Sequence, residues 1–317
     1  MNERNKRPVI VLTGPTAVGK TKTSIALAKR LQTSIISADS MQVYKYMDIG
    51  SAKIMPDEME HVTHYLVDVF EPSEEFHVVR FQEEAKKAME LIWDQGKIPL
   101  VVGGTGFYIQ ALLYDIDFQS EDADLSIRRN YEAYAAEHGA ESLHQKLAEV
   151  DPRSAREIHA NNVKRVIRAL EFYEKNGYPI SQHNETERQK ESPYNFAYFV
   201  LTDDRKKLYR NIDARVDLMM RQGLLDEVRH LKEMGYTKAD NAMQGLGYKE
   251  LLDYLDGMCT LDEAVSIIKR DTRHFAKRQL TWFRREKDVT WLDKSQFATT
   301  DECLDQMMKV LKEKQII

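Results

Sequence analysis

Short apolar runs alternate with helical patterns in the N-terminal third of the chain. The runs lack a regular alternation of polar and apolar residues, which is typical of parallel strands covered on both faces. They span residues 9–13, 34–38, 65–69 and 98–102. Apolar residues recur at helical spacing over 21–31 and 78–95, and Gly96 suits the end of the second helix. This order predicts a doubly wound α/β core with a parallel sheet.

The pattern changes after Tyr114. From about residue 119 to residue 192 the chain is charged and helical. Expected helices span 125–137, 141–149, 151–158 and 162–176, and 182–192 is predicted to be a loop. Strand patterns return at 196–201 and 289–292, with helices between Arg205 and Arg285. We therefore expect a discontinuous core domain, residues 1–118 and 195–317, interrupted by a helical insertion domain, residues 119–194.

A phosphate-binding loop connects the first predicted strand to the first predicted helix. The loop consists of Gly14, Pro15, Thr16, Ala17, Val18, Gly19, Lys20 and Thr21. Its glycines let backbone amides wrap phosphate oxygens, and the helix N-terminus adds positive potential. Lys20 supplies a point charge to the phosphates, and Thr21 offers a hydroxyl to Mg²⁺. An ordinary glycine-rich turn is the alternative, and the loop alone leaves open whose phosphates it holds.

Asp39 follows the second predicted strand. Ligands of an open α/β sheet gather at the carboxyl ends of the strands, so we expect this carboxylate to face the phosphate loop. It would act there as a general base, as an indirect Mg²⁺ ligand, or as the cap of the following helix. Its position alone leaves these roles open.

A glycine-rich turn, residues 103–106, follows the fourth predicted strand. ATPases with a phosphate loop place an acidic metal ligand at a strand end, and Asp68 near the end of the third predicted strand offers such an acid. The glycines let a backbone or a base ring approach closely. Thr105 and Tyr108 add polar and stacking surfaces. A tight turn without a ligand is the alternative.

Arginines recur every five residues at Arg205, Arg210 and Arg215, so they do not share one helical face. One of them placed over the phosphates would neutralise the charge of a leaving group.

Composition leaves nucleic acid open as a partner. The formal net charge is −5, yet residues 269–287 hold eight Lys or Arg against two acids. Aromatic residues interleave with Lys277 and Arg278 there, as binding to phosphates and stacked bases requires. Lys164 and Arg165 belong to a second basic group. Solvated helix faces are the alternative explanation of both groups.

Cysteine usage predicts a reducing compartment. Cys259 and Cys303 lie far apart and lack metal-ligand spacing, which argues against a disulfide framework or a zinc site. The first eight residues precede no apolar stretch long enough for a signal peptide, and no segment reaches transmembrane length. We expect a cytoplasmic, monomeric protein with no membrane partner.

Taken together, these stretches resemble the bacterial tRNA dimethylallyltransferases, also called tRNA isopentenyltransferases, of the IPP transferase family. Besides the phosphate loop, the resemblance rests on Asp-Ser-Met-Gln-Val-Tyr (39–44), Gly-Ser-Ala-Lys (50–53) and Gly-Gly-Thr-Gly-Phe-Tyr (103–108). It continues over 162–171, Gln-Gly-Leu-Gly-Tyr-Lys-Glu (244–250) and Arg-Gln-Leu-Thr-Trp-Phe-Arg (278–284). Gly-Ser-Ala-Lys replaces the usual Gly-Thr-Ala-Lys and keeps the hydroxyl. The resemblance implies a P-loop NTPase-like sheet core with a helical insertion.

The resemblance also implies a reaction, the transfer of a dimethylallyl group from dimethylallyl diphosphate to a tRNA. The acceptor is the exocyclic amino group of the adenosine next to the 3′ side of the anticodon, in tRNAs that read codons beginning with U. Mg²⁺ is the expected cofactor, with Thr21 as its ligand. Asp39 is the candidate base, with Thr16, Lys20 and Arg215 as further catalytic residues.

The same resemblance places the tRNA anticodon stem-loop on several segments, with the helical insertion holding the stem-loop. The expected tRNA-binding residues are Asp39, Ser40, Met41, Gln42, Thr105, Tyr108, Arg128, Lys164, Arg165, Lys277 and Arg278. The target base must be turned out of its loop to reach Asp39.

Three other functions are compatible with a phosphate-binding loop, two of them enzymatic and one non-catalytic. A P-loop small-molecule kinase would transfer phosphate from ATP, and an adenylate isopentenyltransferase would prenylate free AMP or ATP. The long insertion and the basic, aromatic C-terminal stretch disfavour the second rival. A non-catalytic RNA-binding protein would keep its function without Asp39.

Overall fold

The computed structural model describes residues 6–118 and 126–317. The chain divides into two compact units, which we name the core unit (residues 1–113 and 193–317) and the helical unit (residues 114–192). Residues 119–125, which hold the expected domain boundary and the start of the expected helix 125–137, lie outside the described residues. Within the described part, no helix has the length and apolar character needed to cross a membrane.

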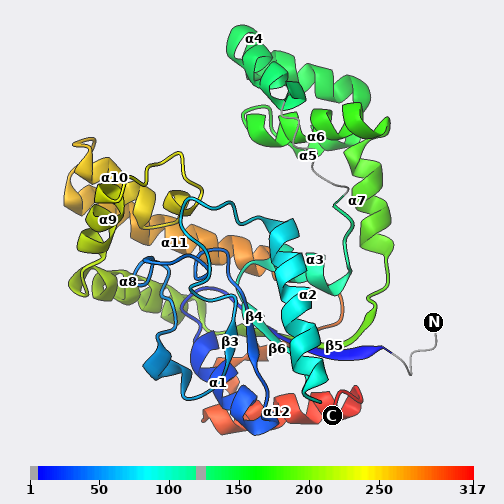
Figure 1. Cartoon of the computed structure of the whole chain (residues 1–317), viewed down its shortest axis with the longest axis vertical. Helices are drawn as coiled ribbons and strands as arrows, with labels where there is room; N and C mark the ends of the chain where they lie inside the picture. Colours follow the sequence, from blue (N-terminus) through cyan, green and yellow to red (C-terminus); the bar gives the residue numbers. More distant parts are fainter. Residues whose placement is uncertain (1–5, 119–125) are drawn as a thin grey trace. The chain divides into compact units, whose positions relative to one another are not determined.

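Six parallel strands form one sheet in the described part of the core unit, in the order β3-β2-β4-β1-β5-β6 (Figure 1). The strands are β1 (Arg7–Thr13), β2 (Ile35–Ala38), β3 (His64–Tyr65), β4 (Leu100–Gly103), β5 (Tyr194–Thr202) and β6 (Val289–Asp293). This confirms the expected parallel α/β core. β3 is shorter than the expected 65–69, because Leu66 and Asp68 adopt positive φ angles of 62° and 59° that a strand does not contain.

Helices cover both faces of the sheet. The helices of the core unit are α1 (Lys20–Leu31), α2 (Val78–Asp94), α3 (Gly106–Leu113), α8 (Arg205–Arg221), α9 (Leu224–Glu233), α10 (Tyr248–Leu255), α11 (Leu261–Phe283) and α12 (Thr300–Glu313). Short 3-10 helices span Pro56–Met59, Ala242–Gln244 and Lys294–Gln296. α1 and α12 pack together on one face, and α2 and α3 lie on the other (Figure 1). α3 and α12 are elements that the hydrophobic pattern did not predict.

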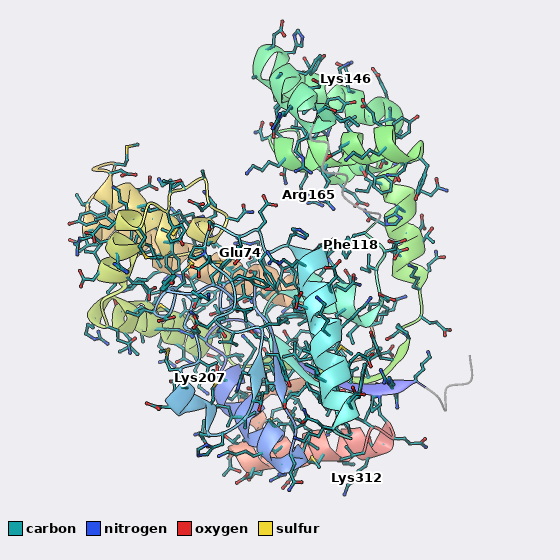
Figure 2. All side chains as sticks on the ribbon, in the orientation of Figure 1. Glu74, Phe118, Lys146, Arg165, Lys207 and Lys312 are labelled. Atoms are coloured by element: carbon teal, nitrogen blue, oxygen red, sulfur yellow. The ribbon has the colours of Figure 1, made fainter. Side chains whose placement is uncertain are left out.

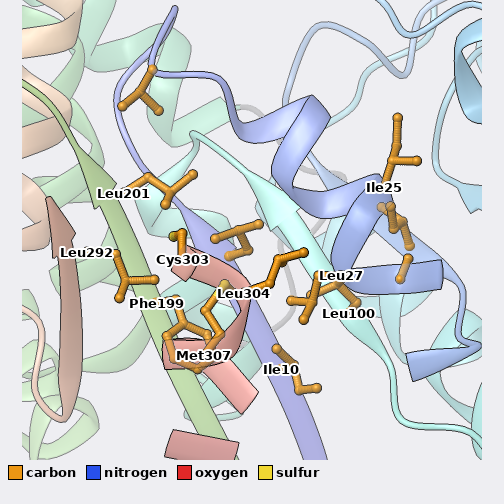
Figure 3. Packing of buried hydrophobic residues seen from close by; sticks show 14 of the residues in the cluster. Ile10, Ile25, Leu27, Leu100, Phe199, Leu201, Leu292, Cys303, Leu304 and Met307 are labelled. Atoms are coloured by element: carbon orange, nitrogen blue, oxygen red, sulfur yellow. The ribbon is translucent and has the colours of Figure 1, made fainter. Parts of the chain in front are cut away.

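The main core lies between the sheet and the α1 and α12 layer (Figure 3). Ile10 and Phe199 of the sheet meet Leu27 of α1 and Met307 of α12, and all four are fully buried. The adjacent Val9 and its neighbours are buried as well, which explains why these strands show no polar alternation. The carboxyl edge of the sheet therefore stands on a closely packed base.

The helical unit contains α4 (Ser126–Val150), α5 (Pro152–Glu157), α6 (Val163–Asn176) and α7 (Ile180–Gln189). Gly139 interrupts α4 with φ 85°, so α4 consists of two helical segments, as the separate patterns at 125–137 and 141–149 indicated. Leu143, Leu147 and Val166 belong to the core of this unit. The loop expected at 182–192 is wrong over most of its length, since α7 extends to Gln189; its polar, largely exposed surface gave no helical periodicity.

Asp151 holds the start of α5 to the start of α7. Its side chain accepts hydrogen bonds from the backbone N–H groups of Ser154 (2.9 Å) and Ser181 (3.0 Å) and from both serine hydroxyls (2.7 Å each). Asp151 is 1% exposed. Burial raises its pKa, but the four hydrogen bonds together bring the pKa below its ordinary value.

We expect Asp151→Ala to destabilise the helical unit by about 2–3 kcal/mol, because buried donors lose their acceptor. The Asp151 contribution is fully present above its unfolded-state pKa of about 3.9 and is lost as the pH falls through the lower folded-state pKa. Hydrogen exchange of α5–α7 in the whole chain measures both effects. Glu149→Gln, an exposed acid on α4, is the matched control; equal protection in the two variants would contradict this role.

Candidate functional site

The strand register brings three sequence motifs to one edge of the sheet. Gly103 at the end of β4 lies opposite Thr13 of β1 on one side and Ala38 of β2 on the other. The Thr13 hydroxyl also donates a hydrogen bond to the Gly103 carbonyl (2.6 Å). The segments that follow these residues, beginning at Gly14, Asp39 and Gly104, therefore leave the sheet side by side. This is the carboxyl edge, where parallel α/β sheets bind ligands.

The phosphate loop has the backbone that an anion cradle requires. Gly19 adopts φ 94° and precedes α1, whose first turn contains no acidic residue and no side-chain cap. Lys20 turns back over the loop, and its ammonium group donates to the carbonyls of Gly14 and Pro15 (3.0 Å each). Lys294 belongs to none of the sequence motifs, and it donates to the Val18 carbonyl (3.0 Å) from the 3-10 helix that follows β6. A Cβ atom at Gly19 would come within 2.6 Å of the Lys294 ammonium group.

Lys20, Asp39 and Arg215 form a charged group at this edge. Burial lowers the pKa of Lys20 to about 8; Asp39 opposes this shift and Arg215 adds to it. Burial also lowers the pKa of Arg215, opposed by Asp39 and Glu58. Among the described residues, none forms a hydrogen bond or an ion pair with the Arg215 guanidinium group. Two partly buried cations thus face one carboxylate, and this excess of positive charge favours binding of an anion.

Asp39 combines a structural contact with an available oxygen. Its Oδ1 atom accepts hydrogen bonds from the backbone N–H groups of Met41 (2.9 Å) and Gln42 (3.3 Å), as a turn-capping aspartate does. Its Oδ2 atom accepts no hydrogen bond from the described residues. No helix follows Asp39 directly, so Asp39 caps a turn and not the helix expected as one alternative, and its second oxygen stays available to a ligand.

The residues expected beside Asp39 differ in exposure. Ser40, Met41 and Gln42 are half-buried, and the Thr105 backbone N–H donates to the Ala38 carbonyl (3.3 Å), next to Asp39. Tyr108 lies in the core instead: its ring stacks on Phe81 at 4.7 Å, and its hydroxyl donates to the Phe76 carbonyl (3.2 Å). A residue at helical spacing after a turn is as readily buried as exposed, and sequence did not distinguish the two outcomes.

The basic residues expected to bind tRNA in the helical unit lie on α4 and α6. Arg128 of α4 forms an ion pair with Glu171 of α6 (3.0 Å), which also pairs with Lys175. Lys164 and Arg165 are exposed on α6, and Figure 2 labels Arg165 there.

α11 carries the basic, aromatic stretch of the core unit. Lys277 and Arg278 are exposed. They line a hollow of about 360 Å³ along this helix with His274, Thr281, Trp282 and Arg285.

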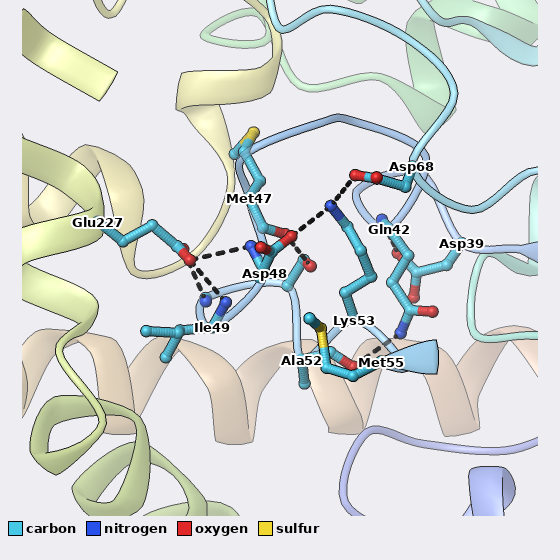
Figure 4. A network of polar contacts seen from close by, with 12 residues as sticks. Asp39, Gln42, Met47, Asp48, Ile49, Ala52, Lys53, Met55, Asp68 and Glu227 are labelled. Carbon is cyan, nitrogen blue, oxygen red and sulfur yellow. Dashed lines mark hydrogen bonds and ion pairs between the residues drawn. The ribbon is translucent and has the colours of Figure 1, made fainter. Parts of the chain in front are cut away.

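Glu227 of α9 anchors the loop that follows Asp39, a role with no local signal in the sequence (Figure 4). Its carboxylate accepts hydrogen bonds from the backbone N–H groups of Asp48 (2.9 Å), Ile49 (2.7 Å) and Gly50 (3.1 Å). It also accepts a hydrogen bond from the Tyr248 hydroxyl (2.7 Å). The motifs at 50–53 and 244–250 are thus joined through a residue in neither of them.

Lys53 connects two parts of the same loop through ion pairs (Figure 4). Lys53 is buried, with 6% of the residue exposed. Its ammonium group donates to the carboxylates of Asp48 and Asp68 at 2.6 Å each. The side-chain amide of Gln42 donates to the Ala52 carbonyl (3.1 Å), and the backbone carbonyl of Gln42 accepts the Asp68 backbone N–H (3.0 Å). Asp68, considered above as a metal-binding acid, therefore pairs with Lys53.

We expect the affinity for inorganic diphosphate to fall above pH 8, by up to about tenfold per pH unit, as Lys20 loses its proton. The pKa of about 8 sets where this fall begins in the free protein. Isothermal titration calorimetry between pH 7 and pH 10 measures it. Lys20→Met should bind weakly without this fall, which separates the lysine from titration of the diphosphate itself. The same fall in both proteins would rule Lys20 out.

Glu227→Ala should accelerate hydrogen exchange of the Asp48, Ile49 and Gly50 amides by about 10- to 100-fold, because these donors lose a charged acceptor worth about 1.5–3 kcal/mol. Asp226→Ala is the control, since the Asp226 side chain on the same helix is 77% exposed. Unchanged exchange in Glu227→Ala would show that the loop is held by other contacts.

Comparison with known proteins places the chain in a family. A model of the IPP transferase family matches residues 42–286, and a model of isopentenyl transferases matches residues 7–74. The tRNA dimethylallyltransferase of Lachnoclostridium phytofermentans is 58% identical over 311 residues, which are 98% of this chain and 99% of that protein. The tRNA dimethylallyltransferase of Acetivibrio thermocellus is 52% identical over 93% of this chain and 95% of its own.

Solved structures of the same family are also similar to this chain. The full-length tRNA isopentenylpyrophosphate transferase of Bacillus halodurans is 42% identical, with a TM-score of 0.73 over 98% of both chains. A eukaryotic dimethylallyltransferase acting on tRNA is 29% identical, with a TM-score of 0.81 over 98% of this chain and 79% of that chain. The chain therefore belongs to the IPP transferase family, the family of the tRNA dimethylallyltransferases.

Proposed function

We propose that the chain transfers the dimethylallyl group of dimethylallyl diphosphate to a tRNA. The acceptor is the exocyclic amino group of the adenosine 3′-adjacent to the anticodon, in tRNAs that read codons beginning with U. The observation that carries this proposal is the charged group at the sheet edge, in which Lys20 and Arg215 outweigh Asp39 beside an uncapped helix N-terminus. Such a site suits a leaving diphosphate, and the relatives' names supply the prenyl donor and the tRNA.

The phosphate loop stabilises the leaving group. As the bond between the allylic carbon and oxygen breaks, negative charge develops on the diphosphate. The loop amides around Thr16, the Lys20 ammonium group and the Arg215 guanidinium group offset this charge. No nucleotide is hydrolysed in this scheme.

Asp39 takes the proton of the acceptor. The adenine amino group is a weak nucleophile, because its lone pair is delocalised into the ring, and it needs a base as the nitrogen–carbon bond forms. The Oδ2 atom of Asp39 receives that proton, while Oδ1 keeps the 39–42 turn in place. The new bond, the departing diphosphate and the transferred proton balance the reaction.

Thr21 is the residue of this chain that suits Mg²⁺. It is exposed in the first turn of α1, and no group of three potential ligands from His, Cys, Asp or Glu exists among the described residues. The ion would therefore depend on diphosphate oxygens, as Mg²⁺ in phosphate sites often does. When bound, it supplies further neutralisation of the leaving group.

The tRNA contacts divide between the two units. Ser40, Met41, Gln42 and Thr105 would surround the target base. Tyr108 would support the turn at Thr105 from the core, since its backbone N–H donates to the Thr105 carbonyl (3.0 Å). The phosphates of the anticodon stem-loop would meet Lys277 and Arg278 on the core unit. Arg128, Lys164 and Arg165 would contact the stem-loop from the helical unit.

We propose that the chain acts as a monomer. The free Cys259 and Cys303 favour a reducing, cytoplasmic location.

Transfer of label from dimethylallyl diphosphate to unmodified tRNA, with Mg²⁺, tests the function. AMP replaces tRNA in a second arm, and ATP with tRNA forms a third. Label on tRNA alone is expected. Label on AMP alone would indicate an adenylate isopentenyltransferase, and phosphate transfer from ATP would indicate a kinase.

Asp39→Asn should lower kcat by about 10²–10⁴-fold and change tRNA affinity less than about threefold, since an amide oxygen keeps the turn and loses the base. Asp39→Ala removes both. A loss of tRNA affinity in Asp39→Asn equal to its loss of kcat would make Asp39 a binding residue.

A further inference from the structure

Gln279 connects α11 to two of the three segments that form the site. Gln279 is buried, with 5% of the residue exposed. Its Nε2 atom donates to the Gly104 carbonyl (2.9 Å), and its Oε1 atom accepts the Thr16 backbone N–H (2.9 Å). Both ends of the carboxamide are therefore used, one on the phosphate loop and one on the turn after β4.

The contact with Gly104 depends on the missing side chain there. A Cβ atom at Gly104 would collide with Gln279 Nε2. The glycine thus leaves the space that the carboxamide occupies, and the two hydrogen bonds fix the orientation of Gln279 in a buried position where an unpaired amide is costly.

The same turn of α11 reaches solvent on another side. Lys277 and Arg278 precede Gln279 directly and are exposed beside the hollow on this helix. Consecutive residues point about 100° apart around a helix, so one rigid segment presents cations outward and a carboxamide inward. A ligand that engages the cations therefore acts on the same backbone that holds Thr16.

We propose that Gln279 is a positioning residue that sets the phosphate loop at Thr16 against the Gly104 turn and couples diphosphate binding to RNA binding on α11. The inference rests on the proposed function, because that function makes RNA the ligand of Lys277 and Arg278. Gln279 acts through Thr16 and does not itself meet the reacting atoms.

Gln279→Met tests this proposal, because methionine matches the length of glutamine and forms neither hydrogen bond. The KM for dimethylallyl diphosphate should rise by about 10- to 100-fold with a smaller change in the KM for tRNA. Ile268→Val, a buried change on the same helix, is the control for a purely structural effect. Reduced folding lowers the active fraction, and hence kcat, without changing KM.

Coupling is measured by binding alone, without the reaction. The affinity for inorganic diphosphate is measured with and without a saturating anticodon stem-loop RNA, and the ratio of the two affinities reports the coupling. The two affinities should differ by at least about fivefold in the unaltered protein and in Ile268→Val. In Gln279→Met the ratio should fall to about one. A ratio of one in the unaltered protein, or an unchanged ratio in Gln279→Met, would overturn the inference. Failure of label transfer to tRNA would instead refute the proposed function, and the binding ratio would still decide the role of Gln279.

Discussion

Excess positive charge at the carboxyl edge of a buried sheet is the constraint on which the site depends. Lys20 and Arg215 are both desolvated enough for their pKa values to fall, and Asp39 balances one of them. Holding such charges together without an anion is unfavourable, so the fold must keep them in place by other contacts. The packed core beneath the strands and the hydrogen bonds around the loops provide them.

Those contacts come from distant parts of the chain. The phosphate loop is held by Gln279 at Thr16 and by Lys294 at Val18, and both residues lie more than 260 positions away. The loop after Asp39 is held by Glu227, about 180 positions away. The C-terminal half therefore fixes the positions of motifs contributed by the N-terminal half.

This separation explains what sequence could predict. The strands, the phosphate loop and the position of Asp39 follow from local patterns, because strand ends and glycine spacing are local properties. Glu227 and Gln279 become recognisable only when the loops they bond are placed beside them. α7 was missed because its polar residues show no apolar periodicity, and Tyr108 was expected at a ligand although it lies in the core.

The two oxygens of Asp39 have different surroundings, which allows one residue to serve the fold and the proposed chemistry. Oδ1 shapes the turn through Met41 and Gln42, so the carboxylate cannot rotate freely and Oδ2 has a defined direction. A nucleotide hydrolase would use an acid at a strand end for its metal, but here Asp68 pairs with Lys53 and β4 ends in glycines. Asp39 therefore keeps one carboxylate oxygen without a hydrogen bond from the described residues, close to the two cations of this edge. The proposed proton transfer to Asp39 and the proposed diphosphate site on the loop both depend on this arrangement.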